Sequence, residues 1–133
     1  MTPLILADTG PLYALADPSD QYHSRANLEL AALGRRRLAI AIHYATLCEA
    51  YTLMLRRLGG KYARQWLGEM FDGAVLLSPE PADYANAAGF LERFDDHAIT
   101  LVDAVTAALA IRLEIPVWAF DSHFVLMRTR QRR

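Results

Sequence analysis

Four short apolar runs constrain the fold of this chain more than any other feature. "PLILA", "RLAIAI", "GAVLLS" and "IPVWAF" occupy residues 3–7, 37–42, 73–78 and 115–120. Each run is apolar almost throughout rather than alternating, which is typical of strands in a parallel sheet covered on both faces. Segments with helical character lie between the runs. This order predicts an α/β/α sandwich with a short, mostly parallel central sheet of four to five strands flanked by helices.

Proline and glycine residues mark the ends of the helices between these strands. Pro11 suits the first position of a helix, Gly34 ends a helix that follows Pro18, and a glycine pair at 59–60 separates the next two helices. The predicted helices cover residues 10–17, 19–34, 43–60, 61–71, 80–94 and 97–111, and a last turn or short helix begins at residue 121.

The composition predicts one soluble domain. The chain has 133 residues, 53% of them hydrophobic, and a chain of this length buries about two thirds of its unfolded surface. The one cysteine, Cys48, forms no internal bridge and indicates a reducing compartment. We find no signal-peptide pattern and no apolar run long enough to cross a membrane. We therefore expect a cytoplasmic protein with one domain over residues 1–133, of which residues 127–133 form a flexible basic tail.

The overall charge does not indicate a nucleic-acid partner. The chain has 14 basic and 15 acidic residues and a net charge of −1, so it exerts no general attraction on phosphate. Basic residues gather locally in "GRRRL" (34–38), "RRLGGKYAR" (56–64) and "MRTRQRR" (127–133). These clusters are equally consistent with solvated surface and with contacts to phosphate groups.

Four acidic residues lie where an α/β protein places its functional site. Asp8 directly follows the first apolar run, and Asp121 directly follows the fourth. The carboxyl ends of parallel strands are the edge at which open α/β sheets bind ligands. Glu49 lies on the helix after the second run, on an apolar face. Asp103 lies in the first turn of the helix "TLVDAVTAALAI", among small residues.

Each acid also has a local structural explanation. Asp103 follows Thr100 by three residues, which is the spacing of a capping box. Asp8 and Asp121 are suited to cap the helices that follow them. Glu49 is harder to explain in this way, because no lysine or arginine stands three or four residues from it.

Taken together, the four acids predict a cation site. In the proposed sheet they converge near one edge, where two carboxylates about 4 Å apart repel by roughly 4 kcal/mol at an effective dielectric constant of about 20. Several such pairs are large against a total stability of about 5–15 kcal/mol. Protonation or a bound cation must therefore relieve the repulsion. Oxygen ligands with access to water select hard ions such as Mg²⁺ or Mn²⁺.

The remaining reactive and aromatic residues give weaker indications. His43, His97 and His123 lie near the proposed edge, but no zinc-binding spacing is present. We interpret them as surface or capping residues, with contact to substrate by His97 or His123 as the alternative. Cys48 is interpreted as a core residue. No phosphate-binding glycine motif is present, so nucleotide cofactors are not indicated. The aromatic residues that could stack on bases are better explained by core or interface packing: Tyr13, Tyr62 and Trp66.

The segments that carry the four acids resemble a known family. "ILADTGPLYALAD" contains Asp8, "HYATLCEAYTLMLRR" contains Glu49, "DHAITLVDAVTAALA" contains Asp103, and "IPVWAFDSHF" contains Asp121 followed by Phe124. In order, spacing and chain length they resemble the PIN-domain ribonucleases, and within these the VapC-type toxins of bacterial toxin–antitoxin pairs. The resemblance extends over nearly the whole chain.

The resemblance implies a PIN-like fold and a metal-dependent endoribonuclease. The activity would be hydrolysis of RNA phosphodiester bonds with Mg²⁺ or Mn²⁺, catalysed by Asp8, Glu49, Asp103 and Asp121. Asp8 and Asp103 would be the main metal ligands, and Glu49 and Asp121 would complete the site, one of them orienting the attacking water. The resemblance also implies a cognate antitoxin as protein partner and a homodimer.

Three hydroxyl residues are expected to support the site, and one departure from the family pattern affects them. Thr9 and Thr100 match hydroxyl residues of the family, but Ala119 stands where the family often has serine or threonine two residues before the last acid. Ser122 is the candidate to supply the missing hydroxyl. Two alternatives stay open: a PIN-like module that binds RNA or a partner without cutting, and a housekeeping RNA-processing nuclease. A phosphatase is disfavoured because Gly10 stands where a second acid would be required.

Overall fold

A computed structural model describes residues 2–129 of the chain. Its centre is a sheet of four parallel strands in the order β3-β2-β1-β4: Val75–Leu77, Ala39–His43, Leu4–Ala7 and Val117–Trp118. The predicted parallel sheet is confirmed, with the lower of the expected strand numbers. The first strand, β1, lies inside the sheet, between β2 and β4.

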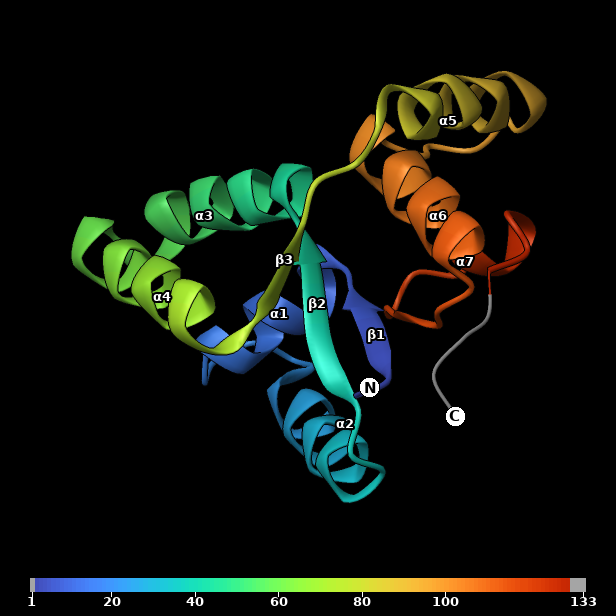
Figure 1. The fold of residues 1–133 in the computed structure, drawn as a ribbon. Coiled ribbons are helices and arrows are strands. Elements are labelled where there is room, and N and C mark those ends of the chain that lie inside the picture. Colours follow the sequence, from blue (N-terminus) through green and yellow to red (C-terminus); the bar gives the residue numbers. More distant parts are fainter. Residues whose placement is uncertain (1, 130–133) are drawn as a thin grey trace.

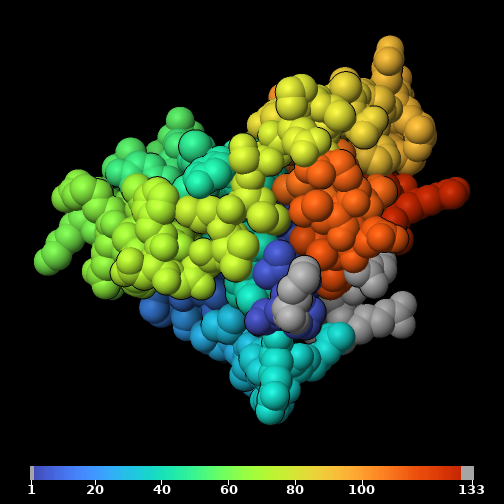
Figure 2. Space-filling view, viewed as in Figure 1, coloured from blue at the N-terminus to red at the C-terminus, as the bar shows by residue number. Residues whose placement is uncertain are grey.

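Seven helices flank the sheet in the described residues (Figure 1). They are α1 (Thr9–Ala16), α2 (His23–Arg35), α3 (Tyr44–Leu58), α4 (Gly60–Gly73), α5 (Pro81–Arg93), α6 (Leu101–Leu113) and α7 (His123–Leu126). In Figure 2, α3 and α4 form one block and α5 and α6 form another, joined by the segment around β3. The predicted α/β/α arrangement is therefore observed.

Two apolar cores, one on each face of the sheet, account for the continuous apolar runs in the sequence. Ile5 points into a core with α1, α2, α3 and α4, whereas its neighbour Leu6 points into a core with α5, α6 and α7. Both side chains are 0% exposed. Because successive residues of a strand point to opposite faces, a strand covered on both sides needs apolar residues at every position.

Part of the predicted basic tail is packed against the fold. Met127 is 1% exposed and lies in the core beneath α6, and the Thr129 hydroxyl donates to the Phe124 carbonyl at 2.9 Å. The flexible tail therefore does not begin at residue 127. Residues 130–133 of the predicted tail lie outside the described residues. Within residues 2–129, no helix is both long enough and apolar enough to cross a membrane.

Candidate acidic site

Asp8 is a buried carboxylate without its expected local partner. It occupies the N-cap position of α1, which begins at Thr9, but its side chain makes no capping hydrogen bond. The side chain is 6% exposed, and its Oδ1 atom has no hydrogen-bond partner. A buried oxygen without a donor costs free energy unless a proton or a cation reaches it. The expectation that Asp8 caps its helix is therefore wrong, which favours a role in binding.

Asp103 has the capping role that the sequence suggested, and it also lies near another of the predicted site acids, Asp121. Its amide donates to the Thr100 hydroxyl at 3.1 Å, and its Oδ2 atom accepts from the Thr100 amide at 3.3 Å, so the predicted capping box is present. The same carboxyl group also turns toward the acids at the strand ends. The residue is 8% exposed and so is buried.

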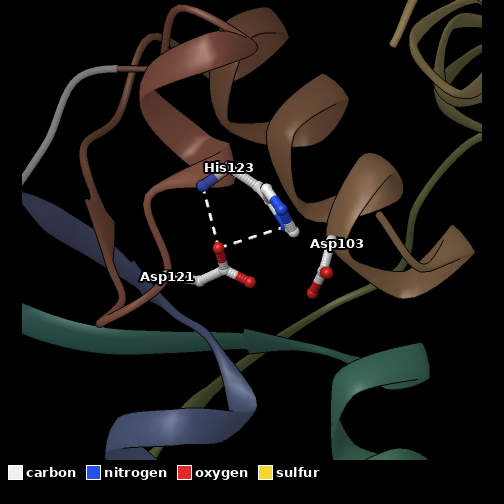
Figure 3. A group of neighbouring side chains, drawn as sticks. All are labelled: Asp103, Asp121 and His123. Atoms are coloured by element: carbon white, nitrogen blue, oxygen red, sulfur yellow. Dashed lines mark hydrogen bonds and ion pairs between the residues drawn. The ribbon is translucent and has the colours of Figure 1, made fainter. Parts of the chain in front are cut away.

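Asp121 and a histidine complete a three-residue group with Asp103 (Figure 3). Asp121 Oδ1 accepts from the His123 amide at 2.8 Å and lies 3.1 Å from His123 Nδ1. Asp103, Asp121 and His123 each offer a ligand atom, and these atoms lie within 4.8 Å of one another. His123 was interpreted as a surface or capping residue, so sequence reasoning missed its place here. The available signal was its position two residues after an acid at a strand end.

Glu49 is connected to the site through the first turn of α1. Its Oε1 atom accepts a hydrogen bond from the Thr9 hydroxyl at 2.6 Å, across 40 residues of sequence. The partner that the sequence did not provide on the helix of Glu49 is therefore supplied by the residue next to Asp8. This bond leaves the second carboxylate oxygen of Glu49 available. Thr9 stands beside the acids, as expected for a supporting residue.

The neighbouring acids raise the pKa of two members of the group, Asp8 and Asp103. Burial, followed by the charge of Asp103, raises the pKa of Asp8 from 3.8 to about 7; Glu49 and Asp121 raise it further, and the Thr9 amide opposes the rise. Burial also raises the pKa of Asp103, to which Asp121 and Glu49 add, whereas hydrogen bonds from Thr100 lower it. We call Asp8, Glu49, Asp103 and Asp121 the acidic site.

The other residues that were predicted to support the acidic site have different structural roles. Thr100 acts through the cap of α6. Ser122 is exposed at the N-cap position of α7 and makes no side-chain capping bond. Ala119 packs against the core on the α6 side, so its methyl group is part of the packing rather than of the acidic site.

The structure corrects the interpretation of Cys48 and decides between the two interpretations of His43. Cys48 is exposed rather than in the core, because it stands two residues from both Thr46 and Ala50 and so faces away from the buried side of α3. His43 is 0% exposed rather than on the surface. Its expected capping role is confirmed, since its Nδ1 atom accepts from the Thr46 amide at 3.4 Å.

The donor set fits a hard divalent cation. Carboxylate oxygens from separate elements converge, one buried oxygen has no donor, and the pKa of Asp8 is raised by burial and by like charges. A cation would satisfy the unpartnered Asp8 oxygen and cancel the repulsion between the acids. Asp103, Asp121 and His123 offer ligand atoms close enough together to hold it, and Asp8, which lines the same cleft as Asp121, is the further candidate. An acidic centre of this kind is suited to binding a phosphate through the cation.

A cleft of about 370 Å³ opens beside two of these acids. We call it the aromatic cleft, and its lining residues are Asp8, Gly10, Tyr13, Asp20, Tyr22, Arg57, Phe120 and Asp121. Tyr13 and Trp66 are buried, as the sequence predicted, whereas Tyr62 is 59% exposed. Tyr22 and Phe120 were not selected from the sequence.

The fold and site define an α/β/α protein with an acidic centre at the carboxyl ends of its parallel strands. The family model of the PIN domain matches residues 5–128, so the chain belongs to the PIN-domain family. The resemblance inferred from the four acidic segments is thereby confirmed at the level of the family. No curated protein matches the sequence significantly.

Several solved structures share the fold. VapC20 from Mycobacterium tuberculosis, described as a sarcin–ricin loop cleaving toxin, has a TM-score of 0.83 at 23% identity over 97% of this chain and 98% of its own. VapBC-1 from nontypeable Haemophilus influenzae has a TM-score of 0.73 at 12% identity, over 97% and 96%. VapBC2 from Rickettsia felis, bound to a promoter DNA fragment, has a TM-score of 0.71 at 16% identity, over 96% of each chain. At these identities the likeness is one of fold.

Proposed function

We propose that this protein is a metal-dependent endoribonuclease and the toxin of a VapBC-type toxin–antitoxin pair. The observation that carries the proposal is the buried, unpartnered oxygen of Asp8, whose pKa is raised to about 7 by burial and, in addition, by the neighbouring acids. Such an arrangement is unfavourable for a purely structural role and becomes favourable with a divalent cation. Membership of the PIN-domain family and the fold shared with VapC20 support ribonuclease activity.

Each residue of the acidic site has a proposed role in RNA hydrolysis. Asp8, Asp103 and Asp121 would hold Mg²⁺ or Mn²⁺, with His123 beside them. A bound cation would supply polarisation of the scissile phosphate and a lower pKa for an attacking water. Glu49, held at one oxygen by the Thr9 hydroxyl, would use its other oxygen to orient the water for in-line attack. The Thr100 amide, which donates to Oδ2 of Asp103 at 3.3 Å, holds that carboxylate in place.

The antitoxin is the proposed protein partner. Structures with this fold include two named as VapBC pairs. An apolar groove of about 300 Å³ between α1 and α4 offers a surface for a partner segment, lined by Leu12, Leu15, Ala16, Tyr62, Gln65, Trp66, Glu69 and Met70. A homodimer and a cytoplasmic location are further expectations for a protein of this kind.

A metal titration tests the cation site without reference to any substrate. We expect Mn²⁺ to raise the melting temperature of the wild-type protein and not that of Asp8→Asn. Glu92→Gln is the matched control, because Glu92 is an exposed acid on α5. A wild-type protein whose melting temperature is unmoved by Mn²⁺ and Mg²⁺ would contradict the proposal.

Cleavage of a structured RNA tests the activity. Because VapC20 is described as cleaving the sarcin–ricin loop, a synthetic hairpin of that loop is the first substrate to use, followed by tRNA. We expect cleavage with Mn²⁺ that is lost in Asp103→Asn and kept in Glu92→Gln. Metal binding without cleavage of any RNA would favour the alternative of a binding module, which Ala119 in place of a hydroxyl residue supports.

A further inference from the structure

The aromatic cleft combines two kinds of chemistry on adjoining walls. Asp8 and Asp121 of the acidic site form one side. The rings of Tyr22 and Phe120 lie on the other, with centroids 5.2 Å apart and planes inclined by 46°. Tyr22 is 41% exposed although it is aromatic. Exposure alone does not distinguish Tyr22 from other surface aromatic residues; its distinguishing feature is its place with Phe120 in the cleft that Asp8 and Asp121 also line.

The aromatic wall is held in place by a chain of contacts that reaches into the core. The Arg25 guanidinium lies 4.4 Å from the Phe120 ring centroid and pairs with Glu29 at 3.0 Å. Glu29 in turn accepts from the indole N–H of the buried Trp118 at 2.8 Å. The ring of Phe120 is therefore positioned before any ligand arrives, which reduces the entropy cost of binding on it.

Arg57 provides a positive charge in the same cleft. Its guanidinium lies 5.1 Å from the ring centroid of Tyr13 and hydrogen-bonds the hydroxyl of that residue, which itself donates to Asp17 at 2.6 Å. Arg57 forms no ion pair with any carboxylate among residues 2–129. A guanidinium on an aromatic ring, with no acidic partner, is well suited to bind a phosphate group.

We infer that the aromatic cleft binds one unpaired nucleotide of the RNA, adjacent to the phosphate that is cut. The base lies against Tyr22 and Phe120, and Arg57 contacts the phosphate on the far side of that nucleotide. The inference rests on the proposed ribonuclease function and deepens it. The cleft volume of about 370 Å³ is within the range of small-ligand sites, about 300–1,000 Å³. Proteins read single-stranded RNA mainly by stacking splayed bases on aromatic rings.

The cleft would then select unpaired over paired RNA. A base in a duplex is stacked on its neighbours and does not present its face to Tyr22. Because every base has a flat aromatic face, the contact is tolerant of base identity. The specificity that follows is for loops and single strands, with cleavage next to the base that enters the cleft.

Binding of short oligonucleotides tests this inference separately from cleavage. The probes are fluorescein-labelled hexanucleotides of adenosine or uridine, together with an abasic ribose-phosphate hexamer of equal charge. Affinity is measured by anisotropy with Mg²⁺, and gels verify that the probes stay intact. We expect Tyr22→Leu to weaken binding of the base-containing probes by ~5- to 150-fold, the range for loss of one base stack. Tyr22→Phe should bind as the wild type does.

Two controls make the result decisive. Tyr84→Leu alters a ring on α5 with 40% exposure, close to the 41% of Tyr22, and should leave affinity unchanged. The abasic probe should bind the wild type and Tyr22→Leu equally. Unchanged affinity of Tyr22→Leu for the adenosine and uridine probes, or an equal loss on the abasic probe, would overturn the inference. Base-dependent binding without cleavage of any RNA would instead contradict the ribonuclease proposal and leave the cleft assignment standing.

Discussion

The carboxyl group of Asp8 is less stable when ionised in the folded chain than in the unfolded chain. Burial is the main reason, and the neighbouring acids add to it. The folded-state pKa of about 7 lies above the ordinary value of 3.8, so the folded state holds this proton over a range in which the unfolded state has lost it. Stability from this group is therefore fully present below about pH 4 and is lost as the pH rises toward about 7.

Asp8→Asn should reverse this loss in metal-free protein. In the presence of a chelator we expect the variant to be more stable than the wild type at pH 8, by several kcal/mol at most and on the order of 4 if the whole shift is expressed. Near pH 4 the two proteins should be equally stable. Urea unfolding at both values measures the difference. A variant that is less stable than the wild type at pH 8 would mean that Asp8 has a stabilising partner in the absence of metal.

The Thr9 hydroxyl should matter for activity more than for stability. Thr9→Val keeps the shape of the side chain but removes the donor that holds Glu49 at 2.6 Å. We expect RNA cleavage to fall by ~10- to 100-fold, which is usual for loss of a residue that orients a metal-site group. Thr9→Ser retains the hydroxyl and should keep most of the activity. Equal cleavage rates for Thr9→Val and the wild type would show that cleavage does not depend on the hydrogen bond from Thr9 to Glu49.

Residue types and strand ends were enough to predict much of the acidic site. Asp8 and Asp121 follow apolar runs, so a parallel sheet had to bring them to one edge. The bond between Thr9 and Glu49 was not predictable, because it depends on how α1 packs against α3. His123 was missed because an acid followed two residues later by histidine is common in turns without any metal.

At the scale of elements, the first turn of α6 both caps the helix and contributes Asp103 to the acidic site. Thr100 and Asp103 exchange hydrogen bonds in the capping box, and Asp103 also faces the other acids. Asparagine at position 103 would keep an oxygen acceptor for the Thr100 amide and lose the charge. Valine at position 100 would lose the hydroxyl acceptor and leave the charge of Asp103 intact. The two substitutions therefore separate the two roles.

Thr100→Val and Asp103→Asn should have opposite effects. We expect Thr100→Val to lower the free energy of unfolding by ~1 kcal/mol, the usual value of an N-cap, and to keep its stabilisation by Mn²⁺. Asp103→Asn should keep or gain stability without metal and lose the response to Mn²⁺. Thermal unfolding with and without Mn²⁺ gives both quantities. A normal Mn²⁺ response in Asp103→Asn would restrict Asp103 to its capping role.

A buried histidine links the helices that carry Glu49 and Asp103. His43 Nε2 lies 2.7 Å from the Thr106 hydroxyl, and that hydroxyl donates to the Val102 carbonyl at 2.9 Å. The ring therefore donates to Thr106 from Nε2 and accepts from the Thr46 amide at Nδ1. This pattern requires a neutral ring, in agreement with burial lowering the pKa of His43 to about 4.

The boundaries of elements were less predictable than their order. The fourth apolar run covers residues 115–120, but β4 contains only Val117 and Trp118. It is an edge strand, and Pro116 at its start has no amide hydrogen to donate, although its carbonyl accepts from Leu6 at 2.9 Å. The apolar pattern of residues 115–120 predicts that they are buried. The length of β4, however, depends on how many residues pair with β1, its one neighbouring strand.

At the scale of the whole molecule, one of the basic clusters lies far from the acidic site and another lies beside it. The chain direction of β2 places residues 35–37 at its amino end, opposite the edge that carries the acidic site. Five strand residues span roughly 16 Å. The basic cluster at 34–38 therefore does not frame the acidic site. The cluster at 56–64 does reach it, through Arg57 in the aromatic cleft.

Salt dependence should distinguish these two arginine clusters. Each arginine that contacts a phosphate of single-stranded RNA adds about 0.7 to the slope of log affinity against log salt concentration. Arg57→Gln should therefore weaken binding of the adenosine hexanucleotide and reduce the slope by about that amount. Arg36→Gln, an exposed arginine before β2, should change neither. A reduced slope for Arg36→Gln with an unchanged slope for Arg57→Gln would place the RNA on the opposite edge of the sheet, away from the acids. Anisotropy over a range of KCl concentrations at constant Mg²⁺ measures both slopes and so gives the path of the RNA across the molecule.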